Sequence, residues 1–187
     1  MRTWHKIGLL IALLAIVIYA FIRLQPASKT ATAPNVLTSV NPTATIPENA
    51  NIPGKCHIRG VLPDELCTPG AADPRVTQDN IMHTICVSGY TKTVRPPVSY
   101  TDQLKTQQIA SYGYADTNRK DYEEDHLISL ELGGSPTDPK NLWPEPGASP
   151  NPKDKIENLC HEKVCSGQIS LSDAQHEIAT DWLTACQ

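Results

Sequence analysis

The feature that most constrains this chain is an uninterrupted apolar run from Ile7 to Ile22 (IGLLIALLAIVIYAFI). The run holds no charged residue and is flanked by Arg2 and Lys6 on one side and by Arg23 on the other. A helix that is apolar on every face belongs in a membrane or in a deep core. Its length falls between a signal-peptide core and the roughly 17 to 25 residues of a spanning helix. We therefore predict a transmembrane anchor or signal segment at residues 7–23.

The charges around this segment predict its orientation. Basic residues tend to stay in the cytoplasm, so Arg2 and Lys6 place residues 1–6 there and send the rest of the chain across the membrane. A small-x-small pattern at residues 31–33 leaves signal cleavage open. The body is then membrane-anchored outside the cytoplasm, in a periplasmic or extracellular space, or it is secreted if the signal is cleaved.

Residues 24–53 are rich in Thr, Pro and Ala, with no aromatic residue, which predicts a disordered linker. The globular body is expected at residues 54–187, long enough for one core. All 20 acidic residues of the chain lie beyond residue 29, against 12 basic ones there, so the body carries a net charge of −8. That balance argues against tight, sequence-specific binding of nucleic acid.

Six cysteines lie in the body, and an even number behind an export segment is typical of a disulfide framework. Cys160 and Cys165 are too far apart on one helix to bridge each other, so we expect one of them to pair with Cys186. The spacings do not match a zinc site. The disulfide candidates are Cys56, Cys67, Cys86, Cys160, Cys165 and Cys186.

Periodicity and capping residues predict three helices. One is expected at about 102–112, capped by Ser99 or Thr101. The second, at 152–164, begins with a proline in its first turn and ends before a glycine. The third, at 172–185, begins at a capping-box pattern of Ser172 and Gln175.

The segment at 122–146 predicts a strand, a turn and a second strand. Residues 122–126 read YEEDH and lead into LISLEL at 127–132, whose alternation we interpret as strand. Gly133 and Gly134, followed by a Ser-Pro-Thr-Asp-Pro cluster, indicate a hairpin turn. Residues 141–143 form the predicted return strand, and the helix at 152–164 follows.

These residues resemble the HNH family of His-Me finger nucleases. The resemblance rests on E-x-D-H-L-I, L-x-L-G-G and N-L between Glu123 and Leu142, and on exported bacterial proteins with YEEDHLI-x-LELGG, NLWPEP and K-D-x-x-E-N, out to about Asp181. It implies an α+β fold with a ββα-metal core at about 122–165 plus flanking helices. It also implies that Asn141 bonds backbone across the loop and orients His126. Where the family pattern has His on the helix, this chain has Asn151.

Elementary chemistry of phosphodiester hydrolysis assigns roles to these side chains. His126 is the expected general base toward water, because imidazole titrates near neutral pH. Asp125 and Asn151 would hold one divalent cation, Mg²⁺ before Mn²⁺ or another ion, through hard oxygen ligands. Asp154 is the alternative ligand, with Asn151 equally suited to cap the helix. Glu123 is expected to support Asp125 from the same strand face.

Lys153 and Arg95 are the candidate phosphate contacts, with a solvated surface as the plainer interpretation. The sequence thus predicts a metal-dependent endonuclease acting on DNA before RNA, without a small-molecule cofactor and with no inhibitor protein identified. The alternative is a non-catalytic, disulfide-stapled interaction module on the same scaffold, because a fold does not fix a function.

Overall fold

A computed structural model describes residues 56–147 and 149–187 of the chain. The predicted N-terminal stretch 1–6, the apolar segment 7–23 and the linker 24–53 lie outside the described residues. No helix within the described ranges is long and apolar enough to cross a bilayer. The helices and 3₁₀ turns are η2 (Gln78–His83), α2 (Tyr90–Val94), α3 (Val98–Ser111), η3 (Arg119–Asp121), η4 (Leu130–Leu132), α4 (Lys153–Cys165) and α5 (Leu171–Asp181).

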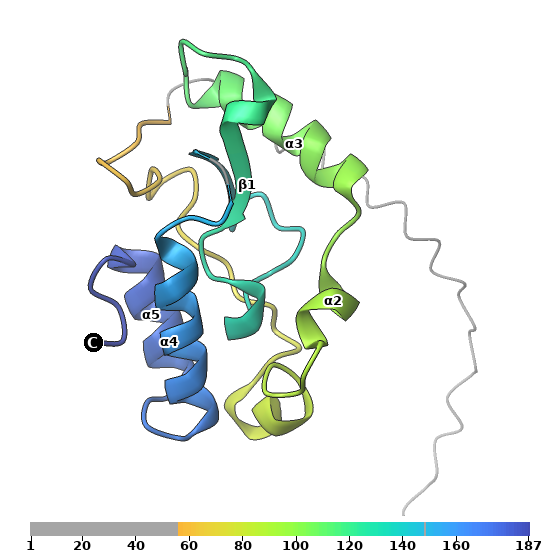
Figure 1. The fold of residues 1–187 in the computed structure, drawn as a ribbon, viewed down its shortest axis with the longest axis vertical. Coiled ribbons are helices and arrows are strands. Elements are labelled where there is room, and N and C mark those ends of the chain that lie inside the picture. The colour runs from red at the N-terminus through yellow and green to blue at the C-terminus, as the bar shows by residue number, and fades with distance from the viewer. Residues whose placement is uncertain (1–55, 148) are drawn as a thin grey trace, which may run out of the picture. The chain divides into compact units, whose positions relative to one another are not determined.

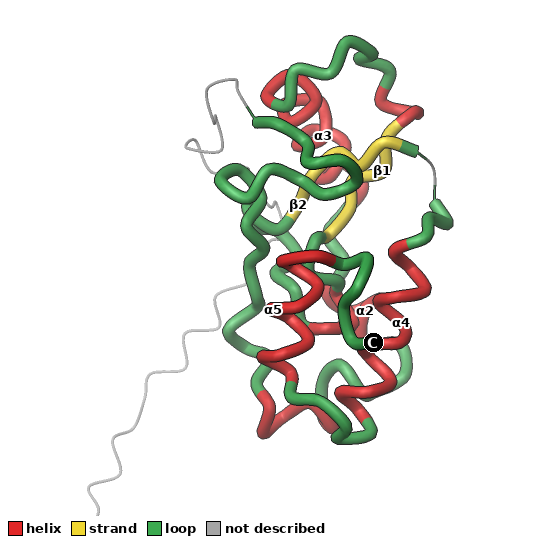
Figure 2. Tube along the Cα trace, turned by 90° about the vertical axis from the view of Figure 1, so that its left-hand side faces the viewer, coloured by secondary structure: helices red, strands yellow, loops and turns green. Residues whose placement is uncertain are grey.

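Two antiparallel strands, β1 (Tyr122–His126) and β2 (Leu142–Pro146), form the sheet, and α4 follows β2 in the chain. Asp125 lies opposite Trp143 and His126 opposite Leu142. Helix α3 contacts both strands, and α4 and α5 lie side by side (Figures 1 and 2). The structure therefore confirms a small α+β domain with the order strand, loop, strand, helix.

The predicted strand at 127–132 is wrong. Strand β1 ends at His126, and the next residues form a loop that closes into the 3₁₀ turn η4. The Asn141 side chain accepts a hydrogen bond from the Ile128 N–H and donates one to the Ile128 carbonyl oxygen. Both backbone groups are therefore already bonded, and no neighbouring strand pairs with Ile128. Alternation would also require one exposed face, whereas Leu127, Ile128, Leu130 and Leu132 are all buried.

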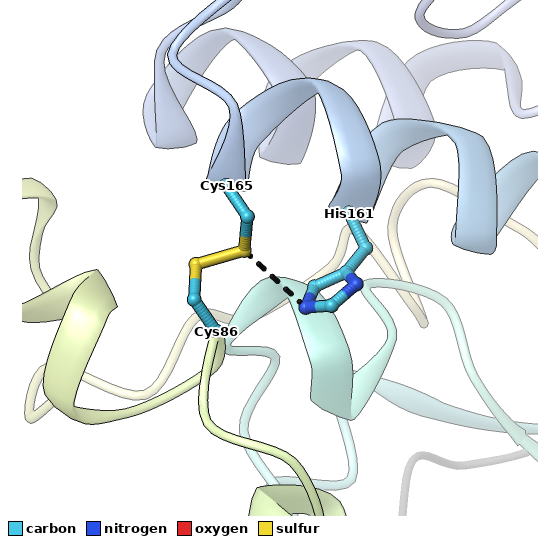
Figure 3. Close-up of side chains that lie close together, drawn as sticks. All are labelled: Cys86, His161 and Cys165. Atoms are coloured by element: carbon cyan, nitrogen blue, oxygen red, sulfur yellow. Dashed lines mark hydrogen bonds between the residues drawn. A yellow bond between two sulfur atoms is a disulfide. The ribbon is translucent and has the colours of Figure 1, made fainter.

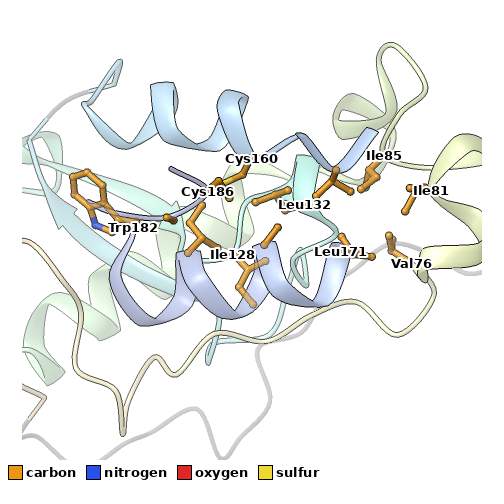
Figure 4. Packing of buried hydrophobic residues seen from close by; sticks show 13 residues of the cluster. Val76, Ile81, Ile85, Ile128, Leu132, Cys160, Leu171, Trp182 and Cys186 are labelled. Atoms are coloured by element: carbon orange, nitrogen blue, oxygen red, sulfur yellow. A yellow bond between two sulfur atoms is a disulfide. The ribbon is translucent and has the colours of Figure 1, made fainter. Parts of the chain in front are cut away.

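The main core lies where α4, α5 and η4 meet the turn η2 (Figure 4). Apolar side chains from α5 follow helical spacing and bury one face of it, with Trp182 at its C-terminal cap. Trp143 belongs to a second cluster with Tyr112 and the Cys56–Cys67 pair. Trp143 is 1% exposed and Trp182 is 4% exposed, so both belong to the core.

Three disulfides staple the domain: Cys56–Cys67, Cys86–Cys165 and Cys160–Cys186. The expectation that Cys186 pairs with a cysteine of α4 is confirmed, and Cys160 is the partner. The Cys86–Cys165 disulfide joins α4 to the segment after η2. The Cys56–Cys67 disulfide closes a short loop at the start of the described chain. Such a framework is compatible with an oxidising compartment outside the cytoplasm.

Two predicted helix starts are displaced. Helix α3 begins at Val98, directly after Pro97, because Tyr100 and Leu104 are both buried and continue its inner face toward the N-terminus. Helix α5 begins at Leu171, with Ser170 as its cap: the Ser170 hydroxyl accepts a hydrogen bond from the Asp173 N–H. Ser172 therefore does not cap this helix.

Candidate active site

Strand β1 sends its polar side chains to two sides. Asp125 and Glu123 contact residues at the start of α4, whereas His126 bonds the loop between the strands. Adjacent side chains of a strand point in opposite directions, which separates Asp125 from His126. The structure thus brings the predicted residues Glu123 and Asp125 to the start of α4, where Asn151 lies, whereas the His126 side chain lies on the other side of the strand.

His126 is buried, at 7% exposure, and its ring has a defined orientation. The Nε2 atom lies 3.1 Å from the Pro136 carbonyl oxygen. A carbonyl can only accept a hydrogen bond, so Nε2 of the neutral ring carries the proton and Nδ1 holds the lone pair. Burial lowers the pKa of His126 below its ordinary value, and Arg95 and Lys153 act in the same direction. The imidazole is therefore neutral at neutral pH and can accept a proton at Nδ1.

Asn141 is fully buried and uses its whole amide. Its Oδ1 accepts from the Ile128 N–H at 2.9 Å and from the Ala71 N–H at 3.3 Å. Its Nδ2 donates to the carbonyl oxygens of Ile128 and Ser135, each at 3.0 Å. The backbone bonds across the loop that the HNH resemblance implies are present. They hold both ends of the loop that carries the Pro136 carbonyl to His126.

Asp125 is paired with a buried cation. Its Oδ2 lies 2.9 Å from the Lys153 Nζ and accepts a hydrogen bond from the Trp143 indole N–H at 3.1 Å. Lys153 is 0% exposed, and its Nζ also lies 2.5 Å from Glu157 Oε1 and 2.9 Å from the His126 carbonyl oxygen. Lys153 is thus no phosphate contact, a correction that follows from its burial.

Asn151 caps α4. Its Oδ1 accepts from the backbone N–H groups of Lys153 at 2.8 Å and of Asp154 at 3.3 Å. The Asp154 carboxylate in turn accepts from the Asn151 N–H at 3.0 Å, so Asn151 and Asp154 form a reciprocal capping box. The Asn151 amide nitrogen donates to Glu123 and Glu145, each at 3.1 Å. Of the two interpretations of Asn151, the structure shows the cap.

Glu123 and Glu145 face each other across the strands. Like charges in such a pair repel, and the shared Asn151 amide offsets this only in part. Burial, followed by the charge of Asp125, raises the pKa of both carboxyls, that of Glu145 to about 8. Glu145 and Glu157 are site residues that the sequence did not single out. The Lys153–Glu157 spacing of four was the available signal for Glu157.

Arg95 lines a pocket of 270 Å³ between α2, η4 and α4. Its side chain is exposed, and its charge reaches His126. Ser129, Glu131 and Glu157 share this lining. A second pocket, of 790 Å³, lies on the α3 side of β1. Its lining holds three basic residues, Lys105, Arg119 and Lys120, and three acidic ones, Asp102, Glu123 and Glu124.

In this arrangement the oxygen atoms of Asp125 and Asn151, the two predicted metal ligands, are bonded to protein groups and are not directed at a shared ion position. The Asp125 oxygen contacts Lys153 and Trp143, and the Asn151 oxygen contacts backbone N–H groups. Within the described ranges, the group with metal-like spacing is Cys86, His161 and Cys165 (Figure 3). Its two sulfur atoms form a disulfide, and the His161 Nε2 lies 2.9 Å from the Ile85 carbonyl oxygen.

Comparison with known proteins adds no assignment to this geometry. No protein-family model, no curated protein and no solved structure matches the chain.

Proposed function

We propose that this domain is an endonuclease-type hydrolase of nucleic acid phosphodiester bonds, with DNA as the first substrate to test and RNA as the second. The observation that carries the proposal is the orientation of His126. A neutral imidazole with its proton fixed on Nε2 by a backbone carbonyl presents Nδ1 as a base. The order of β1, loop, β2 and α4 supports the HNH-like ββα interpretation of the core.

In the proposed reaction, His126 Nδ1 takes a proton from the attacking water as the water oxygen bonds to phosphorus. The P–O bond to the leaving oxygen breaks, that oxygen takes a proton from solvent water, and His126 afterwards releases its own proton to solvent. Strand β1 and the loop that is held by the Asn141 side chain keep the His126 ring in place. The ring therefore needs to move little when it accepts the proton. Arg95 is the candidate contact for the phosphate oxygens, because it is exposed and close enough to influence His126. The basic residues Lys105, Arg119 and Lys120 offer further phosphate contacts along the same strand.

The test is nicking of supercoiled plasmid, and cleavage of single-stranded RNA, by the full-length chain in mild detergent. We expect His126→Ala to lower the rate by about 100-fold or more, the usual contribution of a general base. His176→Ala is the matched control, because His176 is exposed on α5. The wild-type rate should rise with pH, with a midpoint below the ordinary histidine pKa of about 6.5, because burial lowers the pKa of His126. Equal rates for wild type and His126→Ala would refute the assignment.

Reactions with Mg²⁺, with Mn²⁺ and with EDTA belong to the same assay. They test the divalent ion that the sequence predicts on Asp125 and Asn151: loss of cleavage in EDTA would support that ion, and cleavage that persists in EDTA would rule it out. Should no condition give cleavage, the non-catalytic interaction module becomes the better proposal. The burial of His126 and the pairing of Asp125 are the observations that favour it.

We also propose that the domain works outside the cytoplasm, tethered by the segment at 7–23 or released from it. The three disulfides support this location. Modification of intact cells with a membrane-impermeant reagent for lysines should label the domain if it is exposed outside, and a cytoplasmic domain would remain unlabelled.

A further inference from the structure

The Lys153 ammonium group is surrounded by oxygen atoms in the way a bound cation is. Its three acceptors are Asp125 Oδ2 at 2.9 Å, Glu157 Oε1 at 2.5 Å and the carbonyl oxygen of His126 at 2.9 Å. An ammonium has three N–H donors, so each finds one acceptor. The side chain is 0% exposed, and no solvent is needed to complete the set.

The same three oxygens are the kind that a hard divalent ion selects, namely two carboxylates and a backbone carbonyl. They come from the end of β1 and from the second turn of α4, the two elements on which the ββα interpretation expects metal ligands. An ion between them would have to displace the ammonium group, which cannot leave without breaking two buried ion pairs. When ionised, the Asp125 and Glu157 carboxylates together with the Lys153 ammonium carry a net charge of −1. Without the ammonium the two carboxylates carry −2, which a divalent ion would neutralise.

We infer that the Lys153 ammonium is the built-in cation of this site and stands where a divalent metal ion would otherwise bind. Lys153 is then a positioning residue: it fixes the Asp125 carboxylate and the backbone of His126 without touching substrate. The inference rests on the proposed function only for the role of His126. The occupation of the cation position follows from the contacts alone.

Electrostatics keeps the ammonium charged. Burial by itself would lower the pKa of Lys153, but Asp125 and Glu157 outweigh this and raise it above its ordinary value. Burial raises the pKa of Glu157 to about 7 against the opposing effect of Lys153. Binding experiments are therefore best done at pH 8, where Glu157 is mostly ionised and the charge balance above applies.

The decisive experiment removes the internal cation and asks for a metal ion in its place. Wild type, Lys153→Ala and Lys153→Ala/Asp125→Asn are titrated with Mn²⁺ at pH 8, with binding followed by calorimetry and by the electron paramagnetic resonance signal of free Mn²⁺. We expect Lys153→Ala to bind one Mn²⁺ at least tenfold more tightly than wild type, and the added Asp125→Asn change to abolish that gain. Lys155→Ala, an exposed lysine on the same helix, should behave as wild type.

Folding is read in the same samples by thermal unfolding. We expect Mn²⁺ to raise the unfolding midpoint of Lys153→Ala and to leave that of wild type unchanged. A Lys153→Ala protein that folds only with Mn²⁺ present would also support the inference, because the ion then replaces the ammonium. A variant that stays unfolded with the ion, or folds and binds none, would overturn it.

Wild type supplies an independent measurement. One Mn²⁺ bound per wild-type chain and lost in Asp125→Asn would overturn the inference. Cleavage adds a separate readout: a wild-type rate that persists in EDTA, with Lys153→Ala made dependent on Mn²⁺, is expected. If no protein cleaves, the proposed function fails, while the titrations still decide the place of Lys153.

Discussion

Replacing Asn141 with alanine should destabilise the domain by about 3 kcal/mol. The change leaves four backbone groups without their partner: the buried N–H and C=O of Ile128, and the partly buried Ser135 carbonyl and Ala71 N–H. Each intramolecular hydrogen bond contributes about 0.5–1.5 kcal/mol net, and orphaned buried groups lose more. The four bonds together therefore give about 2–6 kcal/mol, and the long contact to Ala71 places the value in the lower half.

This loss is large beside the roughly 5–15 kcal/mol by which a domain of this size is stable. Urea unfolding at pH 6 with the disulfides intact, followed by tryptophan fluorescence, measures it, because Trp143 and Trp182 are both buried. Asn158→Ala is the control: Asn158 is an exposed asparagine of α4, and its loss should change the free energy of unfolding by less than about 0.5 kcal/mol.

A second variant separates the two halves of the Asn141 amide. Asn141→Asp keeps an acceptor for the Ile128 N–H but removes both donors and places a charge beside two carbonyl oxygens. It should therefore be at least as destabilising as alanine at pH 7, and less so at pH 4, where the carboxyl is protonated. A cost below 1 kcal/mol for Asn141→Ala would refute the claim that this amide holds the loop.

Two further substitutions test the strand pair and the loop. The pKa of Glu145 is about 8 in the folded protein and about 4.3 in an unfolded chain. Between these values the folded state keeps a proton that the unfolded state releases. The free energy of unfolding therefore falls as the pH rises from about 5 to 8. Glu145→Gln should remove this loss and gain about 2 kcal/mol on wild type at pH 8 but nothing at pH 4, by urea unfolding; parallel pH profiles would contradict this. Gly134→Ala should destabilise the domain by more than about 3 kcal/mol, because the added Cβ would lie 1.8 Å from the Ile128 carbonyl oxygen, and an unchanged melting temperature would show that the loop is not packed this way.

The loop after β1 shows where pattern reasoning from the sequence fails. LISLEL alternates in sequence, yet four of its six residues are buried apolar side chains. Alternation predicts a strand only when one face meets water and a neighbouring strand supplies hydrogen bonds. Here the Asn141 side chain substitutes for that neighbour at Ile128. A side chain that takes the hydrogen-bonding place of a neighbouring strand produces no periodic pattern in the sequence, so pattern reasoning does not detect it.

A disulfide between Cys186 and one of the two cysteines of α4 could be anticipated because local geometry restricts the choice, but the structure was needed to identify Cys160 as that partner. Two cysteines five apart on a helix cannot meet, and α5 folds back along α4. The partner of Cys165 lies 79 residues away, before both strands. No spacing rule connects residues so distant, since their approach depends on how the α2 segment packs against α4.

The electrostatics of the site shows the same division between local and distant information. A lysine in the first turn of a helix is normally solvated, and the four-residue spacing to Glu157 is visible in the sequence. The burial of Lys153 depends on its contacts with Asp125 and with the His126 carbonyl oxygen, which belong to a strand about 27 residues earlier. Because Lys153 is neutralised inside the domain, it contributes nothing to the attraction of phosphate. The proposed function therefore relies on other residues for phosphate contact, namely Arg95, Arg119 and Lys120, which are exposed, and Lys105, which is half-buried. Three acidic residues, Asp102, Glu123 and Glu124, share the pocket of the last three and reduce its positive charge.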